Sequence, residues 1–170
     1  KYFPSVEDIK KASEILKEIL EPTPFQKNAD LSAKYGADVF LKREDLQMVR
    51  SYKIRGAYNK IRSIDPETLK YGIVCASAGN HAQGVAYACA HLKIQAKIFM
   101  PKTTPKQKID QVRMFGREFA EIILAGDTFD DSAKSAMAYC EEQEMIFIHP
   151  FDDLDVIAGQ GSVAVEFMND

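Results

Sequence analysis

The sequence predicts an α/β fold in which a twisted parallel sheet carries helices on both faces. Two observations lead to this expectation. Short, mostly apolar segments, of which 72–77 is a continuous apolar run, recur at nearly even intervals, as buried parallel strands do. Amphipathic segments of helical period separate these runs, and this alternation favours crossover helices between parallel strands. The runs share no residue pattern, so supersecondary units recur at a regular spacing without a sequence repeat.

The first segment is predicted to be an amphipathic helix. Ser5, with Asp8 three residues later, forms a capping-box-like start. Apolar residues then recur at helical spacing, at Ile9, Ala12, Leu16, Ile19 and Leu20. Pro22 and Pro24 end the helix, because proline cannot continue it. A short strand is expected at about residues 39–42.

From residue 72 onward, strands and helices alternate. Strands are expected at the apolar runs 72–77, 94–100, 119–126 and 145–150. Helices are expected at 79–92, 105–116, 127–143 and 154–168. Pro105 suits the first turn of its helix and Gly116 its end, and Asp127 or Thr128 caps the helix that follows. This order of elements calls for helices on both sides of one sheet.

Composition excludes several classes of protein. Among 170 residues, 46% are hydrophobic and 28% are charged, which is typical of a folded globular chain. The net charge is −3 and no basic patch occurs, so a nucleic-acid partner is not expected. The apolar runs are too short to cross a membrane, and no signal peptide opens the sequence. We therefore expect a cytoplasmic protein with no membrane partner.

The cysteines and histidines indicate no metal site. Cys75, Cys89 and Cys140 are widely spaced in apolar segments, which is typical of reduced core thiols. The three histidines have no ligand-like spacing to one another or to the cysteines. The ends of the chain lead to a further expectation. It begins at Lys1 and stops at Asp170 after an apolar helical stretch, so we expect a fragment of a longer protein.

Two glycine motifs are set aside. Gly79 and Gly84 are spaced as in a phosphate-binding Walker loop, but Val85 stands where its lysine should be. The segment "GQGSVA" (159–164) formally fits a dinucleotide fingerprint. However, it follows an acidic helical segment instead of a strand, so small residues that allow close helix packing are the better interpretation.

The segment "SAGNHAQG" is the best candidate for a ligand site. The strand at 72–76 ends directly in it, and ligands of parallel sheets bind at the carboxyl ends of strands. Ser77, Gly79 and Asn80 open a helix whose backbone N–H groups and dipole stabilise an anion such as a carboxylate. Ordinary helix capping explains the same residues without a ligand. His81 taken alone is more often a capping or packing residue than an acid or base.

Lys53, in "SYKIRGAYNK", is the second candidate. A lone lysine is usually a solvated surface residue. Together with a carboxylate site, however, a lysine at a helix start suits an enzyme that holds an amino acid against an aldehyde cofactor. Lysine forms Schiff bases, and pyridoxal phosphate is the usual aldehyde. Its amine must lose a proton near neutral pH, which burial beside Tyr52 and Ile54 or a positive charge such as Arg55 would favour.

A family resemblance supports this interpretation. It is carried by five blocks in order: "KREDLQMVRSYKIRGAYNKI", "ASAGNHAQGVA", "KIFMPKTTPKQKIDQVRMFG", "LAGDTFDDSAKSA" and "HPFDDLDVIAGQGSVAVE". From about Ile19 to its last residue, the chain resembles the threonine dehydratases, within the tryptophan-synthase-β-like (fold type II) pyridoxal-phosphate enzymes. The resemblance implies a small domain at 52–148. It also implies that 1–51 and 149–170 are incomplete parts of a large cofactor domain, whose glycine-rich phosphate loop would follow residue 170.

The same resemblance implies roles for individual residues. Lys53 would carry pyridoxal phosphate as a Schiff base and later act as the base for the Cα proton of the substrate. Tyr52, often Phe in this family, would flank the cofactor ring, and Asn80 would hydrogen-bond the ring hydroxyl. The loop that receives the substrate carboxylate would comprise Ser77, Gly79, Asn80 and His81.

The implied reaction is β-elimination of water from L-threonine, and less well from L-serine. It gives 2-oxobutanoate and ammonia and is the first step towards isoleucine. The full-length protein would be a homo-oligomer, and the 170-residue chain alone would be inactive. Two alternatives stay open: a serine racemase or serine dehydratase of the same fold, and a truncated fragment without catalytic activity.

Overall fold

A computed structural model, which describes residues 3–169, confirms the α/β class. Its main sheet contains β3 (Ile73–Ala76), β4 (Ala96–Met100), β5 (Ala120–Leu124) and β6 (Ile146–Phe147). The strand order is β5-β4-β3-β6, and each neighbouring pair is parallel. The predicted strands therefore exist, although β6 is shorter than the run 145–150.

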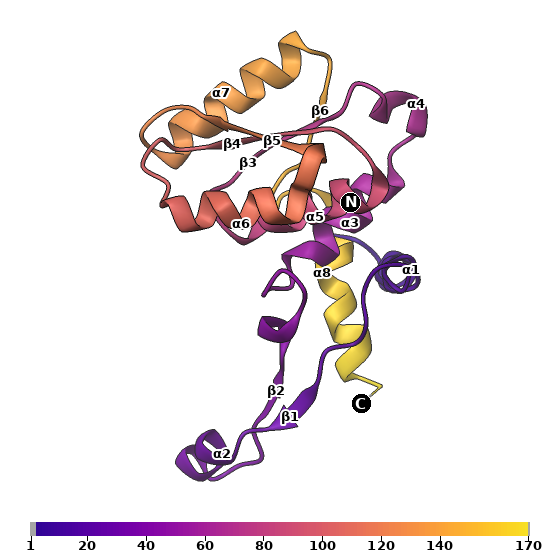
Figure 1. The fold of residues 1–170 in the computed structure, drawn as a ribbon. Helices are drawn as coiled ribbons and strands as arrows, with labels where there is room; N and C mark the ends of the chain where they lie inside the picture. The colour runs from indigo at the N-terminus through magenta and orange to yellow at the C-terminus, as the bar shows by residue number, and fades with distance from the viewer. Residues whose placement is uncertain (1–2, 170) are drawn as a thin grey trace.

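Helices cover both faces of this sheet (Figure 1). Four of them follow the predicted segments: α5 (Asn80–Leu92), α6 (Lys106–Gly116), α7 (Phe129–Glu142) and α8 (Leu154–Phe167). The N-terminal half contributes α1 (Val6–Leu16), α2 (Ala29–Tyr35), α3 (Lys53–Ser63) and α4 (Pro66–Leu69). Two short 3₁₀ turns are η1 (Glu44–Leu46) and η2 (Arg117–Phe119).

Alternating side chains of β3 divide the core in two. Val74 and Ala76 join a cluster with Ala136 and Cys140 of α7 on one face. Cys75 faces the other way, into the larger cluster formed with α3, α5 and α6. Because both faces are covered, the strand is continuously apolar, and this explains why the run was recognisable in the sequence.

The predicted caps are largely confirmed. Ser5 and Asp8 form a reciprocal capping box at the start of α1. Thr128, and not Asp127, caps α7 and forms a second box with Asp131. The prediction that the first helix extends through Leu20 is wrong: α1 ends at Leu16, and turns carry the chain onward to the prolines.

A two-stranded ribbon was only half predicted. β2 (Phe40–Lys42) matches the expected strand, but it pairs antiparallel with β1 (Phe25–Lys27) instead of joining the main sheet. The ribbon and α2 extend away from the sheet (Figure 1). The residues of β1 are exposed and α2 buries none, so neither element leaves the apolar periodicity that sequence reasoning detects.

The second glycine motif lies inside α8, where it permits a close helix crossing. A Cβ added at Gly159 would lie 2.5 Å from the Arg55 carbonyl oxygen and 2.7 Å from Gly56 Cα. The backbones of α3 and α8 therefore touch at this point, which confirms the packing interpretation. The close approach lies near the start of α3, at Arg55 and Gly56.

Other expectations concern the cysteines, membrane-spanning helices and metal ligands. All three cysteines are buried with free thiols, as predicted. Within residues 3–169, no helix combines the length and apolar character needed to cross a bilayer. The same residues contain no group of three or more potential metal ligands from histidine, cysteine and acidic side chains.

Candidate functional site

The loop after β3 lies open at the carboxyl edge of the sheet. Ser77 N donates to the Phe99 carbonyl oxygen at 3.0 Å, which ties the loop to β4. Ser77 Oγ accepts a hydrogen bond from Gly79 N at 3.2 Å. No side chain caps α5 at Gly79, and a Cβ added there would meet no atom within 4 Å. With Asn80 exposed beside it, this helix start can accept an anion from solvent.

Lys53 is the first residue of α3, after Tyr52 as the N-cap. Its Nζ donates to the Pro150 carbonyl oxygen at 2.8 Å and lies 5.5 Å from the centroid of the Tyr52 ring. Burial lowers the pKa of this amine below its ordinary value. The sequence suggested either burial or the charge of Arg55 as the cause of a lowered pKa. In the structure the cause is burial.

A glycine brings the lysine and the loop together. A Cβ added at Gly84 would lie 3.0 Å from Ile54 N and 3.1 Å from the Lys53 carbonyl carbon. α5 can thus lie directly against the first turn of α3. Gly84, which completes the rejected Walker spacing, has a packing role that lets the Lys53 backbone lie against α5.

His81 points into the core and not into the open loop. Its side chain is only 3% exposed, and Nε2 lies 3.0 Å from the Ile148 carbonyl oxygen. A carbonyl oxygen can only accept, so Nε2 carries the hydrogen. Burial lowers the pKa of His81 to about 4, so the ring is neutral near pH 7. A contact between His81 and a substrate carboxylate would therefore use its backbone N–H.

Residues 148–150, here called the connector, follow β6 and pass both Lys53 and His81. Ile148 N donates to the Val74 carbonyl oxygen at 2.8 Å and so attaches the connector to β3. Within the connector, His149 Nδ1 accepts a hydrogen bond from Asp152 N at 2.7 Å. Lys53 and His81 each hydrogen-bond a carbonyl of this one segment.

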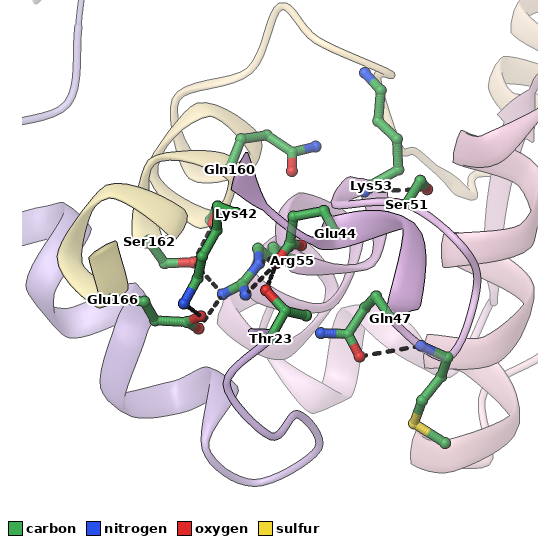
Figure 2. Close-up of polar contacts among 12 residues, drawn as sticks. Thr23, Lys42, Glu44, Gln47, Ser51, Lys53, Arg55, Gln160, Ser162 and Glu166 are labelled. Carbon is green, nitrogen blue, oxygen red and sulfur yellow. Dashed lines mark hydrogen bonds and ion pairs between the residues drawn. The ribbon is translucent and has the colours of Figure 1, made fainter. Parts of the chain in front are cut away.

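A buried group of charges lies next to Lys53 and was not predicted (Figure 2). The Arg55 side chain is 1% exposed, and its Nε and Nη2 each donate to Glu44 at 2.8 Å. Nη1 donates to Glu166 at 2.6 Å and to Ser162 at 3.2 Å. The Lys53 side chain points away from this group in Figure 2. Arg55 is thus fully committed to partners on η1 and α8.

Two further residues complete this ion-pair cluster, defined as Lys42, Glu44, Arg55 and Glu166 with Thr23. Thr23 Oγ1 donates to Glu44 at 2.6 Å, and Lys42 Nζ lies 3.1 Å from Glu166. Burial alone would raise the pKa of Glu44, but the hydrogen bonds from Arg55 and Thr23 hold it below its ordinary value. Its only sequence signal was the charged run "KRED" preceding an apolar helix, and that run also fits a solvated surface.

Comparison with known proteins gives a consistent result. Residues 16–170 match the family model described as "Pyridoxal-phosphate dependent enzyme". The chain is 58% identical over 165 residues to a biosynthetic L-threonine dehydratase of Halalkalibacterium halodurans, covering 97% of this chain and 40% of that protein. The chain thus spans well under half the length of this curated relative.

Two solved structures share the fold over almost the whole chain. A processed threonine deaminase isoform from Solanum lycopersicum is 38% identical with a TM-score of 0.88, covering 99% of this chain and 47% of the other. A serine racemase from maize is 30% identical with a TM-score of 0.92, covering 99% of this chain and 50% of the other. The two neighbours catalyse different reactions on one architecture, so fold alone does not choose between them.

Proposed function

Since this chain belongs to the pyridoxal-phosphate-dependent enzyme family, we propose that it forms part of a threonine dehydratase. The enzyme converts L-threonine to 2-oxobutanoate and ammonia, and it uses L-serine less well. The similarity to a threonine dehydratase over nearly the whole chain supports this choice. In the structure, the observation that carries it is a half-buried lysine whose amine donates to the Pro150 carbonyl oxygen, just past the carboxyl end of β6, on a helix that packs against α5.

The residues at this edge fit pyridoxal phosphate. The cofactor presents an aldehyde and a ring hydroxyl, which need an amine and a hydrogen-bonding side chain. Lys53 offers an amine whose pKa burial has lowered. Asn80 offers an exposed amide, and the space at Gly79 is open to a ligand. Tyr52, whose ring lies beside the Lys53 amine, is the residue proposed to flank the cofactor ring.

Lys53 has two tasks in this proposal. Its amine would hold the cofactor at the aldehyde, and it would take the proton from the substrate Cα. Bound pyridoxal phosphate supplies the reactive aldehyde and a ring that delocalises the electron pair left at Cα. The lowered pKa of Lys53 increases the fraction of neutral amine that can accept a proton. The Pro150 carbonyl orients that amine at the edge of the sheet.

The start of α5 is proposed to receive the substrate carboxylate. The loop residues involved are Ser77, Gly79, Asn80 and His81, with His81 acting through its backbone. A helix N-terminus stabilises an anion by about 0.3–1 kcal/mol. The absence of a side-chain cap at Gly79 leaves this position available to a ligand.

The domain division is part of the same proposal. Residues 52–148 form the small domain, and 1–51 with 149–170 belong to the large one. The main sheet with α3 to α7 falls within the first range, whereas α1, the ribbon and α8 lie on one side of it (Figure 1). The full-length enzyme is further proposed to be a cytoplasmic homo-oligomer, which light scattering and cell fractionation would test.

Racemisation is the second candidate, because of the similarity to a serine racemase. A racemase needs an acid or base on each face of the substrate Cα, and Lys53 serves only one. The family resemblance implies that a racemase would use a serine hydroxyl at the position where Ala78 stands. Ala78 has no hydroxyl, and the neighbouring Ser77 Oγ is engaged by Gly79 N. These features favour elimination, which needs no second group.

Product analysis with the full-length protein and pyridoxal phosphate tests this proposal. L-threonine should yield 2-oxobutanoate, and L-serine should yield pyruvate with little D-serine. Lys53→Ala should abolish both reactions, and borohydride reduction of the holoenzyme should attach the cofactor to Lys53 alone. Formation of D-serine as fast as pyruvate would instead support racemisation, and Ala78→Ser is the change expected to increase it. Label on another lysine would exclude the assigned role of Lys53.

A further inference from the structure

Two side chains of the candidate site meet the same short stretch of backbone. Lys53 Nζ donates to the Pro150 carbonyl oxygen at 2.8 Å, and His81 Nε2 lies 3.0 Å from the carbonyl oxygen of Ile148. These carbonyls are two residues apart in the connector. Any displacement of the connector relative to α5 therefore also moves the acceptor of the Lys53 amine.

The connector receives little support from the sheet. β6 pairs with β3 over only two residues, Ile146 and Phe147. Past them, Ile148 N still donates to the Val74 carbonyl oxygen at 2.8 Å. From there the chain leaves the sheet and crosses its carboxyl edge towards α8. The hydrogen bond from His81 acts at the point where the regular ladder ends.

The His81 ring is suited to this task and not to proton transfer. At 3% exposure it is closed off from solvent, and its Nδ1 has no hydrogen-bond partner among the described residues. The hydrogen on Nε2 is required by the Ile148 carbonyl, which can only accept. Because the buried ring is held in one orientation, it fixes the Ile148 carbonyl relative to α5.

We propose that His81 is a positioning residue for Lys53, because it holds the connector so that the Pro150 carbonyl faces the Lys53 amine. This inference rests on the proposed function, because the position of the Lys53 amine affects the reaction only if Lys53 takes part in it. It differs from the role expected for His81 in binding the substrate carboxylate. A carboxylate ligand affects substrate affinity, whereas a displaced base affects the chemical step.

His81→Phe is the informative variant, because it keeps an aromatic ring but cannot donate to Ile148. In the full-length protein without cofactor, the four amide hydrogens of residues 148–152 (Pro150 has none) should exchange about fivefold to tenfold faster, the effect of one lost buried hydrogen bond. With pyridoxal phosphate bound, the visible circular dichroism per bound cofactor should lose amplitude. The kcat for L-threonine should fall about tenfold to a hundredfold, as for a displaced reacting group, while KM changes less than about threefold.

Two other variants provide the controls. His81→Gln retains an amide N–H that can donate to Ile148 and should restore most of the kcat and the slow exchange. Gln83→Leu, on the same helix, removes a partly buried hydrogen bond to Gln111 of 3.0 Å that does not involve the connector. It should leave exchange at 148–152 and the visible circular dichroism unchanged. If His81→Phe does not fold, His81→Met replaces it in the comparison with His81→Gln.

The outcomes separate this inference from the proposed function. A raised KM with unchanged kcat in His81→Phe would place the side chain on the substrate and overturn the positioning role. Unchanged exchange at 148–152 would overturn it equally. If the wild-type protein does not convert L-threonine, the proposed function fails. Exchange and visible circular dichroism would still decide the role of His81.

Discussion

The ion-pair cluster beside Lys53 allows a quantitative test of the structure. Arg55→Met removes the guanidinium that hydrogen-bonds both Glu44 and Glu166 and leaves each carboxylate without that partner. Breaking a buried ion pair by removing one partner costs about 3–5 kcal/mol. The two carboxylates are 12% and 16% exposed, and Lys42 still lies near Glu166, so the lower end applies. We expect Arg55→Met to lower the free energy of unfolding by about 3 kcal/mol.

Denaturant unfolding followed by circular dichroism measures this loss. With a urea m-value of about 2 kcal/mol/M, the midpoint should fall by about 1.5 M at constant m. Arg62→Met is the matched control on the same helix. Its partner Glu18 lies 3.2 Å away with side chains 50% and 46% exposed, so this pair should contribute less than about 1 kcal/mol.

The pH dependence of the free energy of unfolding tests the same Glu44–Arg55 pair. The folded-state pKa of Glu44 lies below its ordinary value of 4.5, so its pairing stabilises the fold above that pH. The contribution disappears as pH falls through the folded-state pKa. The difference between wild type and Arg55→Met should therefore be smaller at pH 4 than at pH 7.

Two results would contradict the assignment of Arg55 to a buried ion-pair cluster. One is a loss below about 1 kcal/mol, the range of an exposed pair. The other is a failure of Glu44→Gln, added to Arg55→Met, to recover stability. Because the double variant removes the carboxylate that lost both guanidinium hydrogen bonds and keeps Glu166 paired with Lys42, it should be more stable than Arg55→Met alone.

Three further predictions concern other parts of the molecule. Gly159→Ala should destabilise the fold by about 1–3 kcal/mol in urea unfolding, because its Cβ would lie 2.5 Å from the Arg55 carbonyl oxygen; a neutral effect would contradict the close crossing. Asn80→Ala should weaken pyridoxal phosphate binding about twofold to tenfold in a spectroscopic titration, the worth of one hydrogen bond, and unchanged binding would remove Asn80 from the site. Burial lowers the pKa of His81 from 6.5 to about 4, so the unfolded state binds the proton first as pH falls. Protonation of His81 in the unfolded state should therefore lower the free energy of unfolding by about 3 kcal/mol between pH 6.5 and 4. In His81→Phe, the free energy of unfolding measured in urea should depend less on pH over this range.

Local patterns in the sequence determined much of the fold. β3 was recognisable because a strand covered on both faces is apolar throughout, and β4 is apolar except for Lys97. The capping residues Ser5 and Thr128 act on N–H groups three positions away, so their roles follow from neighbouring residues alone. Lys53 and the loop at 77–81 were found because each lies at a helix start.

Only the tertiary structure decided which of these elements meet. The strand order β5-β4-β3-β6 and the pairing of β1 with β2 depend on packing between distant segments. Lys53 and Pro150 are 97 residues apart, and Arg55 and Glu166 are 111 apart. His81 was expected to line the ligand loop through its position in the motif, yet its ring turns into the core. A side chain's direction and its partners are determined by how helices and strands pack, which short-range periodicity does not specify.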